Sequence, residues 1–107
     1  MIVRAWRGRA APAMPDAYPE HFRYRVLPSL RAMPGFLGAS LLRHDRPDEI
    51  EFLLLTRWAS HEAIRAFAGE HPDRAVVEPE AVEALVSFDA TVRHYDVIEE
   101  AAGHPLS

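Results

Sequence analysis

The stretch IEFLLLTRW, residues 50–58, decides the fold of this chain. Its middle places apolar side chains on both faces of a strand, and a strand buried on both faces needs two covers. Ser60 follows and can cap a helix that carries Ile64, Phe67 and Ala68 on one side. One cover must therefore be helical, and we expect the other to be a ligand cavity, a second subunit, or both.

The residues before this stretch predict a strand and a long helix. Residues 2–9 alternate between two faces, which is typical of a strand. Asp16 can cap the helix, whose apolar side chains recur at spacings of three and four from Tyr18 to Met33. Pro28 lies inside this helix and should kink it, because proline lacks the N–H that bonds to the preceding turn.

The residues after it complete the pattern. Residues 36–46 predict a strand that forms a hairpin with residues 50–58, a short helix begins at Glu78, and residues 88–98 predict the last strand. The order of elements favours a ferredoxin-like α+β sandwich, βαββαβ, with a four-stranded antiparallel sheet covered by helices on one face. We expect one domain over residues 1–98 and a flexible C-terminal tail over residues 99–107.

The second face of this sheet would remain apolar. Phe52, Leu54 and Trp58 share one strand parity, and Leu53 and Leu55 share the other. Exposed apolar patches of this size usually mark an interface. We therefore expect two copies to pair through their open sheet faces as a homodimer, closing a dimeric α+β barrel.

The composition excludes several kinds of chemistry. The 107 residues contain no Cys, Lys, Asn or Gln, so thiolate metal sites, side-chain Schiff bases and side-chain amide contacts are all impossible. The net charge of −4 argues against nucleic acid as a partner. No apolar run approaches the roughly 20 residues of a membrane span, and the N-terminus enters a strand without a leader pattern. We expect a cytoplasmic protein that does not bind membranes.

Three short motifs carry a resemblance to a known family. They are Pro34-Gly35-Phe36, the junction at residues 58–63 with the sequence WASHEA, and the closing Arg93-His94-Tyr95. In order and spacing the chain resembles the antibiotic biosynthesis monooxygenase family of dimeric α+β barrels, over residues 1–98.

The resemblance implies oxidation of phenolic substrates by O2 without metal or flavin, as in the best-known members of that family. Other members degrade haem, and the superfamily also holds isomerases and cyclases. The quinone-forming and haem-degrading members use a pocket Asn, which this chain lacks, and the haem-degrading ones place Trp where this chain has Phe67. We therefore do not expect haem degradation, and we expect no cofactor.

A reaction of this kind needs a base, a cation to hold the resulting anion, and a dry pocket. Histidine is the natural base near neutral pH, and arginine suits a phenolate or enolate because its charge is permanent. His94, which shares strand parity with Val92, is the candidate base, and Arg4, which shares a face with Trp6, is the candidate anion holder. The alternatives are a structural imidazole at a strand or dimer seam, and an arginine that faces solvent.

Aromatic and polar side chains supply the candidate substrate contacts. We expect the first and third strands to pair in parallel, which would bring Trp6 and Trp58 together as stacking surfaces, with Phe52 and Thr56 on the same face. The alternative is that these rings fill the core or the interface. His71 and Arg74 lie in a loop that could border the pocket, or simply form a solvated turn.

The six histidines form no paired spacing and have no cysteine partners, so we expect no metal site. The leading interpretation is a small cofactor-independent monooxygenase that acts on a hydrophobic aromatic or enolisable molecule. Two alternatives remain open. One is a non-enzymatic barrel that binds a small ligand or only assembles, and the other is an isomerase or cyclase in the same pocket.

Overall fold

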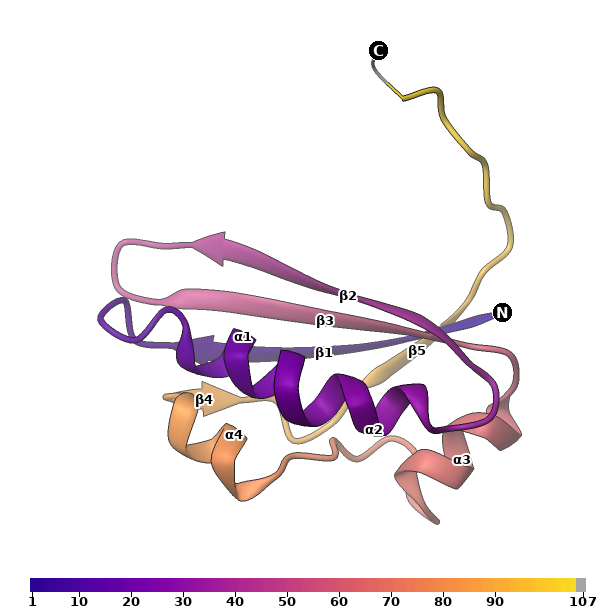
Figure 1. Ribbon diagram of the computed structural model, residues 1–107, viewed down its shortest axis with the longest axis horizontal. Coiled ribbons are helices and arrows are strands. Elements are labelled where there is room, and N and C mark those ends of the chain that lie inside the picture. Colours follow the sequence, from indigo (N-terminus) through magenta and orange to yellow (C-terminus); the bar gives the residue numbers. More distant parts are fainter. Residues whose placement is uncertain (106–107) are drawn as a thin grey trace.

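The computed structural model describes residues 1–105 and shows an α+β sandwich with helices on one face of the sheet (Figure 1). The sheet order is β2-β3-β1-β4, with β5 also paired to β1, and all pairings are antiparallel. This is the ferredoxin-like arrangement that the sequence predicts, with five strands in place of four. The bounds of the strands are β1 Ile2–Ala10, β2 Phe36–Asp45, β3 Ile50–Trp58, β4 Ser87–Phe88 and β5 Arg93–Asp96.

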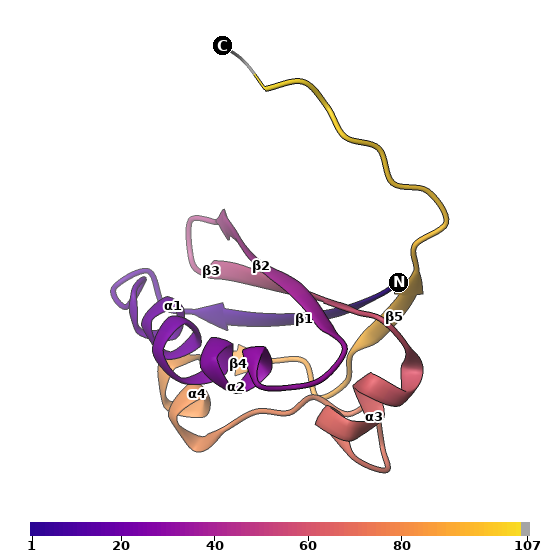
Figure 2. The same cartoon turned by 45° about the vertical axis from the view of Figure 1, so that its right-hand side comes forward.

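The helices all lie below one side of the sheet, and the other side carries no element (Figures 1 and 2). The crossover from β1 to β2 consists of α1 Ala17–His21, a π-helical turn η1 Phe22–Val26, and α2 Leu27–Arg31. The second crossover contains α3 His61–Ala68 and α4 Pro79–Ala84. No helix within the described residues is long and apolar enough to cross a membrane.

The predicted parallel pairing of the first and third strands is wrong. β1 and β3 run antiparallel, so Ile2 faces Trp58 in register and Trp6 faces Leu54. The reason is topological, because the crossover returns β2 parallel to β1 and the following hairpin reverses the direction of β3. The two tryptophans therefore lie at different positions along the sheet.

Strand parity decides which side chains enter the core. Even-numbered residues of β1 and β3 face the helices, and Phe52, Trp58, Leu30 and Ile64 are the largest side chains that are fully buried. Odd-numbered residues, including Leu53 and Leu55, point to the open face.

A π-helical turn precedes Pro28, and the predicted kink stays a prediction. The N–H of Leu27 donates to the carbonyl of Phe22, five residues earlier, immediately before the proline. π-Helical turns of this kind are frequent at functional sites.

The prediction of one continuous last strand over residues 88–98 is wrong, because the structure has two short strands there, β4 and β5. Between β4 and β5 the chain leaves β1, and the N–H groups of Ala75 and Val92 donate to the carbonyls of Ala90 and Asp73. Residues 99–105 have no regular secondary structure, and the end of the predicted tail, residues 106–107, lies outside the described residues.

Candidate functional site

A cavity of about 70 Å³ lies between the helix-covered face of the sheet and its helices. The even-numbered parity of β1 and β3 brings Arg4, Trp6, Leu54 and Thr56 into its wall. This cavity lies on the helix-covered side of the sheet, and a separate groove lies on the open side, where the sequence predicts a ligand cavity, a second subunit, or both. The remaining lining comes from the helices and from the segments around α4: Tyr18, His21, Val26, Ser29, Leu30, Phe67, Val76, Val77, Glu78, Ala81 and Val92.

Three polar residues of β3, β1 and β5, which are Thr56, Arg4 and His94, lie in one row across the sheet, and Ala39 of β2 continues the row. Ala39 pairs with Thr56, Thr56 pairs with Arg4, and Arg4 pairs with His94. The row is polar at its centre although the strands are apolar, so its residues must satisfy one another.

Arg4 is only 5% exposed, and its guanidinium is held by three acceptors. One Nη donates to the carbonyl of Pro72 and lies 3.0 Å from Nε2 of His94, and the other donates to the carbonyl of Arg74 at 2.8 Å. Burial lowers the pKa of Arg4 to about 10, so the side chain is cationic at neutral pH. Its charge also lies over the ring of Phe67, 5.8 Å from the ring centroid.

His94 lies behind Arg4 and does not line the cavity. Because arginine can only donate, Nε2 of His94 accepts from it and the ring is neutral. The ring's Nδ1 faces Oδ1 of Asp73 at 3.5 Å. Burial and the charge of Arg4 lower the pKa of His94, and Asp73 opposes this shift. The role of His94 as the base stays a prediction. Its Nε2 is in contact with Arg4 and does not face the cavity.

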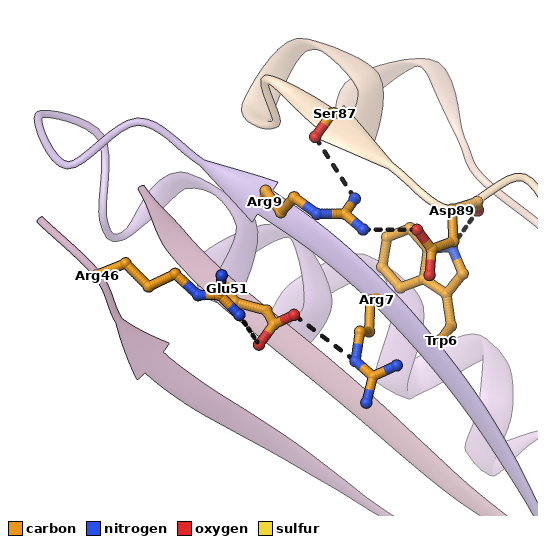
Figure 3. A network of polar contacts seen from close by, with 7 residues as sticks. All are labelled: Trp6, Arg7, Arg9, Arg46, Glu51, Ser87 and Asp89. Carbon is orange, nitrogen blue, oxygen red and sulfur yellow. Dashed lines mark hydrogen bonds and ion pairs between the residues drawn. The ribbon is translucent and has the colours of Figure 1, made fainter. Parts of the chain in front are cut away.

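The tryptophans are fixed by hydrogen bonds of their indole N–H groups. Trp6 donates to the carbonyl of Asp89 at 2.8 Å, beside the ion pair of Arg9 with the Asp89 carboxylate (Figure 3). Trp58 donates to Oγ1 of Thr56 at 2.9 Å. Trp6 thus forms a rigid aromatic wall, while Trp58 supports Thr56 from within the core.

Three predicted site residues, Arg4, Trp6 and Thr56, come together at the cavity, and the others do not. Trp58 is completely buried between Phe36 and Phe67, and Phe52 packs on Tyr18 in the core.

The loop of His71 and Arg74 contributes through its backbone. Both side chains are exposed, and it is the carbonyls of Pro72 and Arg74 that bind Arg4.

Sequence reasoning missed His21, Ser29 and Glu78 as cavity residues. His21 is three positions after Tyr18, so helical spacing alone could have placed it on the same inward face. No sequence pattern places Glu78 at the cavity. The position of the chain before α4 depends on the hydrogen bonds between residues 73–75 and residues 90–92.

The described residues contain no group of three or more His, Asp or Glu side chains that could hold a metal ion.

The structure is a ferredoxin-like domain with a small cavity between sheet and helices. The family model of the antibiotic biosynthesis monooxygenases matches residues 1–79, and the chain belongs to this family. No curated protein matches the sequence at a significant level.

Solved structures agree with this assignment of the fold. A Bacillus cereus protein of the antibiotic biosynthesis monooxygenase type is 17% identical, with a TM-score of 0.67 and 98% of each chain covered. The haem-degrading MhuD of Mycobacterium tuberculosis is 24% identical, with a TM-score of 0.59, over 95% of this chain and all of its own. SnoaB, a cofactor-independent oxygenase from Streptomyces nogalater, is 20% identical, with a TM-score of 0.62, over 92% of this chain and 95% of its own.

Proposed function

We propose that the protein is a small cofactor-independent monooxygenase that acts on a hydrophobic aromatic or enolisable molecule bound beside Arg4. One observation carries this proposal. A buried guanidinium stands at the wall of an apolar cavity, and among the described residues no carboxylate lies in direct contact with it, although the charge of Asp73 acts on it from farther away. A buried cation without an anion in contact favours a ligand that supplies one.

The walls of the cavity support an aromatic ligand. Trp6, Phe67 and Leu54 supply flat or apolar surface, and Thr56 and Ser29 add hydroxyl groups. Pockets of this composition, mostly apolar with a few polar groups, are typical of small-molecule sites. SnoaB, which shares this fold, is a cofactor-independent oxygenase.

The proposed reaction starts from the anion. Loss of a proton makes a phenolate or enolate, whose charge Arg4 stabilises, and the electron-rich carbon reacts with O2. In the overall balance a CH2 group and O2 become a C=O group and water, so the substrate carbon is oxidised by the oxygen that it consumes. The role of Arg4 is electrostatic, and removal of such a contact typically costs about 10²–10³ in rate.

Haem is not part of this proposal, although two of the similar structures hold haem or a manganese porphyrin. The cavity of about 70 Å³ is small beside the roughly 300 Å³ or more of sites for drug-sized ligands. A monocyclic or bicyclic molecule suits it better than a porphyrin does.

We also propose that two copies pair through the open sheet face, and that the protein is cytoplasmic. The groove on that face is lined by apolar and polar side chains together: Ala5, Trp6, Leu53, Leu55 and Tyr95, with Arg7, Asp89, Thr91 and Arg93. A second copy would cover the two leucines, and it offers the same self-complementary surface in return.

A ligand-binding protein without catalysis is the second candidate. The observation that favours it is the contact of His94 Nε2 with Arg4, since that nitrogen is then not free to act on a ligand in the cavity.

Oxygen uptake separates the two candidates. Wild-type protein is supplied with 1,3-dihydroxynaphthalene and with aromatic ketones, and O2 consumption is followed at an electrode. We expect consumption that falls about 10²-fold or more in Arg4→Met, whereas Arg65→Met, at an exposed arginine of α3, retains it. Binding without O2 consumption across the panel would support the binding protein and contradict the oxygenase.

A further inference from the structure

His21 is a buried histidine whose Nε2 has no hydrogen-bond partner among the described residues. The residue is 8% exposed, and it lines the same cavity as Arg4. A buried polar nitrogen without a partner is destabilising, and most buried polar groups in proteins therefore have a hydrogen-bond partner. An occupant of the cavity would supply the missing partner.

Glu78 is the charged group nearest to this nitrogen. Its Oε2 lies 3.8 Å from His21 Nε2, too far for a hydrogen bond but close enough for an ion pair once the ring is protonated. The Glu78 side chain is 45% exposed, so it connects the buried ring to solvent.

Of the other titratable groups that line the cavity, two already carry their protons, and the third, Glu78, is 45% exposed to solvent. Arg4 is already cationic. Tyr18, whose ring centroid lies 6.2 Å from that of His21, has its pKa raised by burial and by Glu78, so it remains a neutral phenol. The unpaired Nε2 of His21 is thus a buried nitrogen that faces the cavity, and Glu78 lies beside it to balance a positive charge.

We propose that His21 is the catalytic base of this site and that Glu78 is its charge partner. The acidic C–H or O–H bond of a small aromatic ketone or phenol breaks, and its proton goes to Nε2 of His21. The electron pair stays on the ligand as an enolate or phenolate beside Arg4. The Glu78 carboxylate stabilises the imidazolium and passes the proton to solvent. This inference rests on the proposed function only for the choice of ligand class.

Hydrogen–deuterium exchange tests the proton transfer without oxygen. The test compound is 2-tetralone, a bicyclic aromatic ketone with acidic C–H bonds beside its carbonyl. It is incubated in D2O without O2, and deuterium uptake at carbon is followed by NMR. We expect exchange catalysed by the wild type and lowered about 10²-fold or more in His21→Gln, the size typical of a lost general base. Glu78→Gln should lower it about tenfold.

The control is His104→Gln, the same change at an exposed histidine outside the elements, which should leave exchange unchanged. Circular dichroism verifies that each variant is folded, and Glu78→Gln keeps the test informative if the His21 variant does not fold.

Two results would overturn the inference. The first is that His21→Gln exchanges at the wild-type rate, or that Glu78→Gln does so if it is the only variant that folds. The second is that the wild type shows no exchange above background. When air is then admitted, exchange without O2 consumption would keep His21 as the base and contradict the oxygenase function instead.

Discussion

At the scale of single residues, the site depends on one buried cation and the groups that hold it. Arg4 binds two loop carbonyls and the ring of His94, and Asp73 lies on the far side of that ring. The Arg4 guanidinium is thus positioned by backbone carbonyls of residues 72 and 74, in a segment that the sequence predicts only as a loop. The side chains of Arg4, Trp6 and Thr56 were predictable from strand parity, whereas these carbonyl contacts depend on tertiary structure.

The lowered pKa of His94 leads to a prediction about pH and stability. The folded state holds the ring neutral, and the unfolded chain binds its proton more readily. The unfolded state therefore binds more protons, and stability falls as the pH drops through about 6.5, the usual value for histidine, toward the lower folded value. His94→Gln should flatten this part of the curve, as measured by chemical unfolding between pH 7.5 and pH 5.

Asp73→Asn provides the companion measurement. Asp73 raises the pKa of His94 against burial and Arg4, so its removal should lower that pKa further in an NMR titration of the ring. An unchanged or higher pKa would show that the contact between Asp73 and His94 has no electrostatic role.

At the scale of elements, two of the three family motifs, Pro34-Gly35-Phe36 and residues 58–63, describe packing. The Gly35 carbonyl accepts from the N–H of Ala59 at 2.9 Å, and the rings of Phe36 and Trp58 meet edge to face with centroids 5.5 Å apart. The Oγ of Ser60 accepts from the N–H of Ala63, which caps α3 as predicted. These residues join the turn before β2 to the start of α3, so they specify the fold and say little about the reaction.

Glycine at position 35 should be required by this junction. Gly35 has φ of 83°, and a Cβ there would lie 2.6 Å from the Cβ of Ala63. Gly35→Ala should lower the free energy of unfolding by about 1–3 kcal/mol or more, from backbone strain and the clash together. Gly69→Ala is the matched control, because Gly69 has φ of 82° with nothing within 4 Å of its added Cβ.

The difference between the two glycine variants isolates the close packing against α3. Equal losses in the two variants, measured by chemical unfolding, would mean that the junction tolerates a methyl group and that only the backbone conformation matters.

Element types and order were predictable from periodicity, and two departures were not. The π-helical turn before Pro28 is closed by a local bond from Leu27 to Phe22, and the split of the last strand depends on hydrogen bonds to residues 73–75. The cavity residues His21, Ser29 and Val92 lie at or beside these two irregular places. Local patterns can predict regular elements, but they do not predict where a chain departs from them.

At the scale of the whole molecule, the sheet leaves one face without a cover. We expect the protein to sediment as a dimer at micromolar concentration, because Leu53 and Leu55 lie on that face and no helix of the described residues covers it. Leu55→Arg should give a folded monomer, since a charge at the centre of the interface would be buried without a partner. Val82→Arg, at a 46% exposed residue of α4, should remain a dimer. A monomeric wild type would contradict the barrel.

The central claim is that Arg4 makes the cavity a site for the anionic form of a small aromatic ligand. The most direct measurement is the absorption spectrum of 4-nitrophenol during titration with the protein, because phenol and phenolate absorb at different wavelengths. We expect 4-nitrophenol to bind as the phenolate. The apparent pKa of its hydroxyl group should be lowered by the wild type and not by Arg4→Met. Binding as the neutral phenol, or equal spectra with both proteins, would contradict it.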